Sequence, residues 1–191
     1  MIDLGAKKLI LASQSPRRKE LLKGLGFDFE VRTKDTGEDF PEDLNPSEVA
    51  GYLSAKKAAA FAKEIGPEEI LLASDTVVIL EGKILGKPSD KEEAYEMLSR
   101  LSGKQHLVTT AVTFLTLERN LTLSDTAKVY FKKLSNTEIE YYISNFKPFD
   151  KAGAYGIQEW IGFIGVEKIE GSYFTVMGLP IHLVYAVLKN W

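Results

Sequence analysis

Short apolar runs and helix-spaced apolar positions alternate along this 191-residue chain. Residues 9–12 (Leu-Ile-Leu-Ala) form the first run and predict a buried strand that ends at a polar turn. Ser15 suits the N-cap of a following helix, and Pro16 suits its first turn, where a missing N–H costs nothing. Three leucines within residues 21–25 give this helix an apolar face, and a nearby glycine ends it. Strand, turn and helix are therefore all specified locally.

The rest of the pattern predicts strands and helices in mixed order. The most apolar run starts at Ile70 and predicts a buried strand. Glu81-Gly82 follows it and is typical of a hairpin turn. An α/β fold with a mixed, twisted sheet follows, and no repeat, linker or low-complexity tract divides residues 1–191 into independent domains. Further strands are predicted over residues 27–31, 105–117, 121–131 and 163–169. Further helices are predicted over residues 46–65, from Ser89 or Asp90 to residue 101, from Ser135 or Asn136 to residue 145, and after Pro180.

Composition narrows the classes of protein that fit. The net charge of −3 argues against general nucleic-acid binding, which needs a broad cationic surface. The absence of cysteine excludes disulfides and thiolate metal sites, and two histidines are too few for a His-rich zinc site. The chain has neither the signature of a signal peptide nor an apolar run long enough for a membrane span, so we expect a cytoplasmic protein with no membrane partner.

A basic cluster opens the first predicted helix. Arg17, Arg18 and Lys19 stand in its first turn, where cations oppose the helix dipole by about 0.3–1 kcal/mol each. With Ser13, Ser15 and the unpaired N–H groups of the turn, the arginines could bind a phosphate. The alternative is a capped surface helix with a solvated basic turn, and the pattern alone leaves both open. The spacing of a P-loop is absent.

A lone carboxylate, Asp75, stands in the middle of the most apolar predicted strand. A buried carboxylate needs a cation, a metal or a proton to transfer, so a functional role is favoured over a merely structural one. Lys87 is fixed on a rigid turn between Gly86 and Pro88 and is a candidate partner for an anion. Lys56 and Lys57 on the second helix are further candidates, although most helix lysines are solvated.

An acidic loop adds candidate metal ligands. Residues 33–45 contain five carboxylates, and one of them, such as Glu38, beside Asp75 would suit Mg²⁺ or Mn²⁺. Gln158 lies in a glycine-rich segment and could bind a base edge through its amide or cap a turn. His106 and His182 fit structural roles better. Cations, a buried carboxylate and oxygen ligands together suit hydrolysis of a phosphoanhydride.

Five motifs in order resemble the Maf nucleotide pyrophosphatases, and the resemblance covers nearly the whole chain. Each motif alone would be suggestive, whereas the ordered set is highly specific. The motifs are Leu-Ala-Ser-x-Ser-Pro-Arg-Arg-x-Glu-Leu-Leu (11–22), Ser-Asp-Thr-Val-Val (74–78), Gly-Lys-Pro (86–88), Leu-Ser-Gly-Lys-x-His (101–106) and Asp-Lys-Ala-Gly-Ala-Tyr-Gly-Ile-Gln (150–158).

The resemblance implies an elongated mixed sheet flanked by helices, with two lobes and a cleft, similar to inosine triphosphate pyrophosphatases. It implies hydrolysis of dTTP and UTP to the monophosphate and pyrophosphate with a divalent cation, and it suggests a homodimer. Asp75 would be the proton acceptor and, with Glu38, a metal ligand. The substrate-binding positions would be Ser13, Arg17, Arg18, Lys57 and Lys87 for the phosphates, and Arg17, Thr76 and Gln158 for pyrimidine preference.

Departures from the family pattern keep other functions open. Lys56 competes with Lys57 in the segment where the family has Leu-Ala-x-x-Lys-Ala. Glu159 replaces the usual glycine, and Trp160 follows it, which predicts a bulkier or more acidic pocket rim. This change lends weight to a housecleaning pyrophosphatase for modified nucleotides. A nucleotide- or DNA-binding regulator of cell division is the non-enzymatic alternative.

Overall fold

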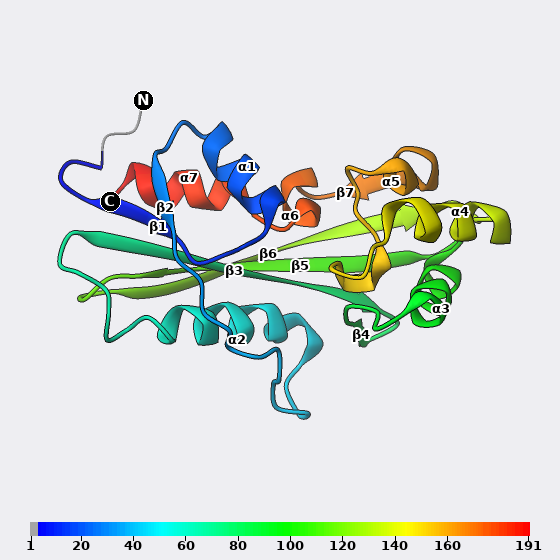
Figure 1. Ribbon diagram of the computed structural model, residues 1–191, viewed down its shortest axis with the longest axis horizontal. Helices are drawn as coiled ribbons and strands as arrows, with labels where there is room; N and C mark the ends of the chain where they lie inside the picture. Colours follow the sequence, from blue (N-terminus) through cyan, green and yellow to red (C-terminus); the bar gives the residue numbers. More distant parts are fainter. Residues whose placement is uncertain (1–3) are drawn as a thin grey trace. The chain divides into compact units, whose positions relative to one another are not determined.

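A computed structural model describes residues 4–191 of the chain (Figure 1). Most predicted elements are present, several of them with shifted ends. The strands are β1 (Lys8–Leu11), β2 (Phe29–Val31), β3 (Glu69–Leu80), β4 (Lys83–Leu85), β5 (Gln105–Leu115), β6 (Asn120–Phe131) and β7 (Val166–Glu170). The helices are α1 (Pro16–Gly24), α2 (Pro46–Ala59), α3 (Lys91–Leu101), α4 (Asn136–Phe146), the 3₁₀ turn η1 (Ala152–Ala154), α5 (Trp160–Gly165), α6 (Tyr173–Met177) and α7 (Ile181–Lys189).

Within residues 4–191, seven strands form one mixed sheet in the order β2-β1-β3-β5-β6-β7, with β4 paired to β3. The strand β1 runs parallel to β2 and β3, whereas β4 is antiparallel to β3 and β7 is antiparallel to β6. The predicted α/β class is therefore confirmed. The described part of the chain divides into two compact units: residues 4–75, 110–125 and 178–191 form the first, and residues 76–109 and 126–177 form the second.

In the first unit, helices cover both faces of the sheet. Figure 1 shows α1 and α7 on one face and α2 on the other. Because side chains alternate along a strand, Leu71 and Ala73 of β3 face the apolar cluster that also contains Phe61 and Ile65. Asp75 continues this alternation, which places its carboxylate on the α2 face of the sheet. The position of the buried acid thus follows from the strand period.

The second unit has its own apolar core. Helices α3 and α4 pack against the ends of β3, β5 and β6, and fully buried Leu98, Leu101 and Tyr142 lie at the centre. Local signals fix both helix starts: Asp90 caps α3, and Ser135 forms a capping box with Glu138 on α4. Asp90 and Ser135 were each one of two predicted caps.

Two predicted elements differ from the structure. The helix expected over residues 46–65 ends at Ala59, because Phe61 and Ala62 donate to carbonyls only three residues back and the chain tightens into turns. The strand expected over residues 163–169 is wrong in its first half, where α5 replaces it. Ile161 is fully buried in the second core, so tertiary packing outweighs the local strand pattern. No helix within residues 4–191 is long and apolar enough to cross a membrane.

His106 is a buried ring of the second unit with an expected effect on acid stability. Its Nε2 lies 2.7 Å from the hydroxyl of Tyr155, and its Nδ1 has no hydrogen-bond partner among the described residues. Burial lowers the pKa of His106 from 6.5 to about 4. The unfolded chain therefore binds a proton that the folded chain does not between these pH values.

We expect the contribution of His106 to the free energy of unfolding to be complete above pH 6.5 and to fall by about 3 kcal/mol as the pH drops to 4. Denaturant melts of the wild type and His106→Gln at several pH values measure this, since glutamine does not titrate. The difference between the two proteins should shrink as the pH falls. Parallel pH dependences would contradict the assignment.

Candidate active site

The turn between β1 and α1 places three polar groups around one helix N-terminus. Ser15 is the N-cap, and its Oγ accepts from the N–H of Arg18 at 3.5 Å. The Oγ of buried Ser13 accepts from the N–H of Ser15 at 3.2 Å. Arg18 turns its guanidinium back, and Nη1 lies 3.5 Å from Ser13 Oγ. The predicted strand, turn and helix are confirmed, and they bring Ser13 and Arg18 together.

Arg18 is held by a segment from the far end of the chain. Its Nε donates to the carbonyl of Gly178 at 2.8 Å, and the same carbonyl accepts from Ser74 Oγ at 3.2 Å. Burial lowers the pKa of Arg18; the Asp75 carboxylate opposes this shift, the Arg17 cation adds to it, and Glu38 opposes it. Asp75, Glu38 and Arg17 thus all act electrostatically on Arg18.

Asp75 finds its cation on α2. Its side chain is 9% exposed and accepts a hydrogen bond from the ammonium of Lys57. A buried carboxylate without such a partner would be strongly destabilising. The expectation that Asp75 needs a cation, a metal or a transferable proton is met here by a cation. Lys56, one residue earlier, takes another direction and pairs with Asp39.

Two lysines attach the acidic loop to α2 and the turn that follows it. Lys56 Nζ lies 2.8 Å from Asp39 Oδ1 and donates to the Asp39 carbonyl at 3.1 Å. Lys34 Nζ donates to the carbonyl of Ala60 at 2.8 Å. Between them, Gly37 adopts φ +63°, a conformation that favours glycine. This attachment sets the position of Glu38, the residue after Gly37.

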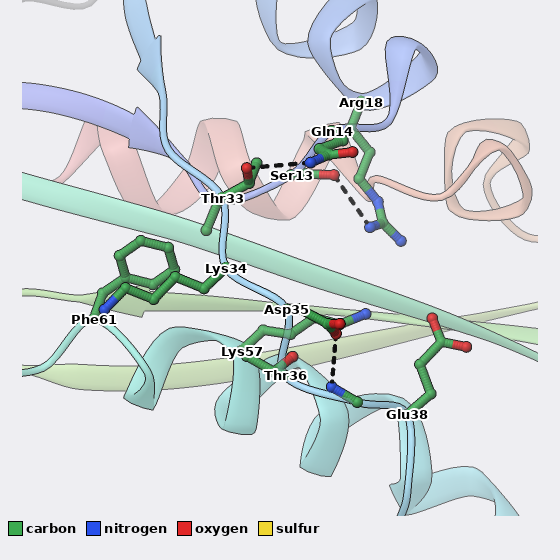
Figure 2. Close-up of a pocket in the computed structure, with 12 residues that line it drawn as sticks. Ser13, Gln14, Arg18, Thr33, Lys34, Asp35, Thr36, Glu38, Lys57 and Phe61 are labelled. Carbon is green, nitrogen blue, oxygen red and sulfur yellow. Dashed lines mark hydrogen bonds between the residues drawn. The ribbon is translucent and has the colours of Figure 1, made fainter.

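A pocket of about 490 Å³ lies within the first unit (Figure 2). Figure 2 shows Arg18 extending from α1 and Glu38 from the acidic loop toward the same region, with Ser13 beside Arg18. Four of the predicted site residues line it. The lining consists of Ala12, Ser13, Gln14, Arg18, Thr33, Lys34, Asp35, Thr36, Gly37, Glu38, Lys57 and Phe61.

Some contributors to this site were not predicted. The carbonyl of Gly178, just before the last helix, accepts from Arg18. Gln14 and Thr33 line the pocket and are joined by a hydrogen bond of 3.3 Å from Nε2 to Oγ1. Nothing in the local pattern marks these residues, because their role depends on which distant segments meet.

Thr76, Lys87 and Gln158 belong to the second unit, and the structure places them only within it. Gln158 is half-buried, and its Oε1 has no hydrogen-bond partner within the described part of the chain. The glycine-rich segment before it packs against the turn that carries exposed Lys87, since the N–H of Gly153 donates to the carbonyl of Gly86 at 2.9 Å.

The Glu159 side chain lies in the second unit and has two partners there. It is 20% exposed, and its Oε1 lies 3.2 Å from the ammonium of buried Lys151. Its other oxygen accepts a hydrogen bond from Tyr142. Most of its charge is therefore balanced within the unit.

The described carboxylates fit a metal that is bound together with a phosphate ligand. Residues 4–191 contain no group of three or more His, Cys, Asp or Glu side chains placed to hold a metal ion. Glu38 and Asp75, which both act on Arg18, offer hard oxygen ligands. Mg²⁺ usually keeps several waters and takes one or two carboxylates plus substrate phosphates, so a pair of carboxylates suffices.

The fold and the pocket define an α/β protein with a polar pocket, which is lined by Ser13, Arg18 and Lys57, and Lys57 pairs with the buried carboxylate of Asp75. The chain belongs to the Maf-like proteins, because the model of this family matches residues 8–191. The resemblance noted in the five motifs is thereby confirmed.

Curated relatives extend over nearly the full length of the chain. A protein of Bacteroides fragilis is 50% identical over 191 residues, which cover 100% of this chain and 99% of the relative. One of Flavobacterium psychrophilum is 50% identical over 183 residues, covering 96% and 94%. Both relatives are named dTTP/UTP pyrophosphatase.

Two solved structures overlap part of the chain. A nucleoside-triphosphatase, or dITP/XTP pyrophosphatase, of Mycobacterium abscessus is 16% identical with a TM-score of 0.42, and the Staphylococcus aureus Ham1 protein is 15% identical with a TM-score of 0.47. Each match covers 65% of this chain and 72% of the other. These similarities are too low to support a conclusion about function.

Proposed function

We propose that the protein hydrolyses dTTP and UTP to the nucleoside monophosphate and pyrophosphate, with Asp75 as the proton acceptor and a divalent cation as cofactor. The observation that carries the proposal is the pairing of Lys57 with buried Asp75 beside an arginine-containing pocket. The names of relatives at 50% identity supply the substrate class.

Three kinds of cationic or donor group support binding of a triphosphate. The Arg18 guanidinium, Ser13 Oγ and the N-terminal turn of α1 face one region of the first unit. Arginine matches phosphate oxygens with a planar set of donors, and a helix N-terminus favours anions. Cations in the first turn of α1, unfavourable for the helix alone, are explained if a phosphate lies beside them.

Asp75 is the group proposed to activate water. Hydrolysis adds water across the anhydride between the α- and β-phosphates, so one water proton must be accepted as the bond forms. The Asp75 carboxylate can accept this proton, and the Lys57 ammonium holds the carboxylate in place. Glu38 and Asp75 would hold the metal ion, which when bound neutralises charge on the phosphates.

The roles proposed for residues of the second unit come from their places in the family motifs. Within the second unit, these motifs would assign Lys87 to phosphate binding, and Thr76 and Gln158 to the preference for pyrimidines. The unpartnered Oε1 of Gln158 suits this role, because uracil and thymine present an N–H donor at N3.

A nucleotide panel with product identification tests the proposal. Purified protein with Mg²⁺ or Mn²⁺ should release pyrophosphate, and not orthophosphate, from dTTP and UTP. A higher kcat/KM for modified nucleotides would favour the housecleaning hydrolase instead. Salt-sensitive DNA binding without hydrolysis would favour the regulator.

Substitutions of the two adjacent lysines of α2, Lys56 and Lys57, should have very different effects on kcat/KM. Lys57→Ala removes the cation from Asp75, and we expect kcat/KM for dTTP to fall about 100-fold. Lys56→Ala removes an exposed ion pair with Asp39, which water screens strongly, and should change kcat/KM by less than about fivefold. Steady-state kinetics of both variants measure the difference. Equal losses would contradict the assignment of Lys57 as the functional lysine.

A further inference from the structure

The second unit contains a buried set of ionisable side chains that the proposed mechanism does not use. It consists of Glu159, Lys151 and Tyr142, named here the Glu159 cluster. The ammonium of Lys151 lies 3.2 Å from Glu159 Oε1 and 2.7 Å from Asp150 Oδ1, and the Lys151 side chain is 8% exposed. The hydroxyl of Tyr142 donates to Glu159 Oε2.

The cluster is held together more tightly than a surface ion pair. A buried ammonium without a carboxylate is costly, so Lys151 keeps Glu159 in place. Burial, reinforced by the hydrogen bond to Glu159, raises the pKa of Tyr142 well above its usual value. The tyrosine therefore stays protonated and donates to the carboxylate.

The same cluster fixes the backbone around Gln158. The Tyr142 hydroxyl accepts from the N–H of Gly156 at 3.0 Å, and the N–H of Glu159 donates to the Gly156 carbonyl at 3.0 Å. A Cβ atom at Gly156 would lie 2.8 Å from Glu159 Cδ and 3.1 Å from Lys151 Cε. Both ends of the segment 156–159 are thus tied to the cluster, and Gln158 lies between them.

We propose that Glu159 is a positioning residue, which acts through Lys151 and Tyr142 to orient the Gln158 amide and so sets the preference for uracil and thymine over cytosine. This inference rests on the proposed function. Its chemical basis is the unpartnered Oε1 of Gln158, which can accept from the N3–H of uracil or thymine. Cytosine presents an acceptor at N3, so the same orientation disfavours it.

A purely structural role makes a different prediction. If the cluster only stabilised the fold, its loss would lower the melting temperature and reduce kcat/KM for every nucleotide by a similar factor. A positioning role instead changes the ratio of kcat/KM for UTP to that for CTP. The ratio therefore separates the two roles.

The test compares Glu159→Ala, Glu159→Gln and Tyr142→Phe with the wild type, and Glu140→Gln of an exposed α4 carboxylate serves as the matched control. We expect Glu159→Ala to lower the UTP to CTP ratio about tenfold, mainly through KM for UTP, because small misplacements of a positioned group are costly. Tyr142→Phe should lower the ratio without leaving a buried charge unpaired. Glu159→Gln, which can still accept from Tyr142, should restore part of the preference, and Glu140→Gln should match the wild type.

Amide hydrogen exchange over residues 153–160 is a second readout that needs no substrate. Loss of the Glu159 carboxylate should speed exchange at Gly156, whose N–H is bonded to Tyr142. An unchanged nucleotide ratio or unchanged exchange, in a wild type that cleaves UTP, would overturn this inference and leave the proposed function standing. A wild type that cleaves neither UTP nor dTTP would overturn both.

Discussion

Asp75→Asn should lower kcat for dTTP by about 10³-fold, the middle of the range for loss of a general base. Asparagine keeps the size of the side chain but cannot accept the proton from water. The variant should remain folded, because the partner Lys57 is 20% exposed and can reach solvent once its carboxylate is lost. Pyrophosphate release and a circular dichroism melt on the same preparation measure both parts.

The matched control is Asp28→Asn, which neutralises an exposed carboxylate just before β2. It should retain wild-type turnover. An Asp75→Asn protein that is folded and turns over within about tenfold of the wild type would exclude Asp75 as the general base.

Gly162→Ala should produce the largest loss of stability. A Cβ at this position of α5 would overlap the carbonyl oxygen of Ile157 and would lie 2.5 Å from its carbonyl carbon. Backbone cannot yield as a flexible side chain does, so the segment must shift, at a cost of about 3 kcal/mol or more. Because Ile157 precedes Gln158, the same shift should weaken the preference for UTP.

Gly24→Ala is the control for this substitution. Gly24 ends α1, and a Cβ there would meet nothing within 4 Å. Alanine is the better helix former, so this variant should equal the wild type or gain up to about 1 kcal/mol. Thermal melts of the two variants should differ clearly, and equal melting temperatures would contradict the close packing of α5.

The helix starts predicted correctly are those that local chemistry determines. Ser15 and Asn45 cap helices through their own side chains, and each is followed by proline. By contrast, α5 forms where the pattern favoured a strand, because Ile161 is buried in the core and Gly162 packs on the Ile157 carbonyl. Such contacts depend on segments that meet only in the folded chain, so no local pattern could predict them.

The candidate site also contains residues that the sequence identifies and residues whose role only the fold determines. Residue type and context singled out Asp75, since a lone carboxylate in an apolar strand needs a partner. Which lysine supplies that partner was undecided from the sequence, because Lys56 and Lys57 are adjacent and differ only in the direction they leave α2. Glu38 is one of five carboxylates in its loop, and the loop is positioned by Lys34 and Lys56, whose contacts depend on the fold.

The two compact units each contain one of the two tryptophans of the chain. In the second unit Trp160 lies 4.7 Å, between ring centroids, from Tyr141, and in the first unit Trp191 lies 5.4 Å from the guanidinium of Arg119. Intrinsic fluorescence can therefore report each unit separately once the other tryptophan is replaced by phenylalanine. Coincident transitions from Trp160 and Trp191 would identify a single cooperative domain over the whole chain, as the sequence predicts.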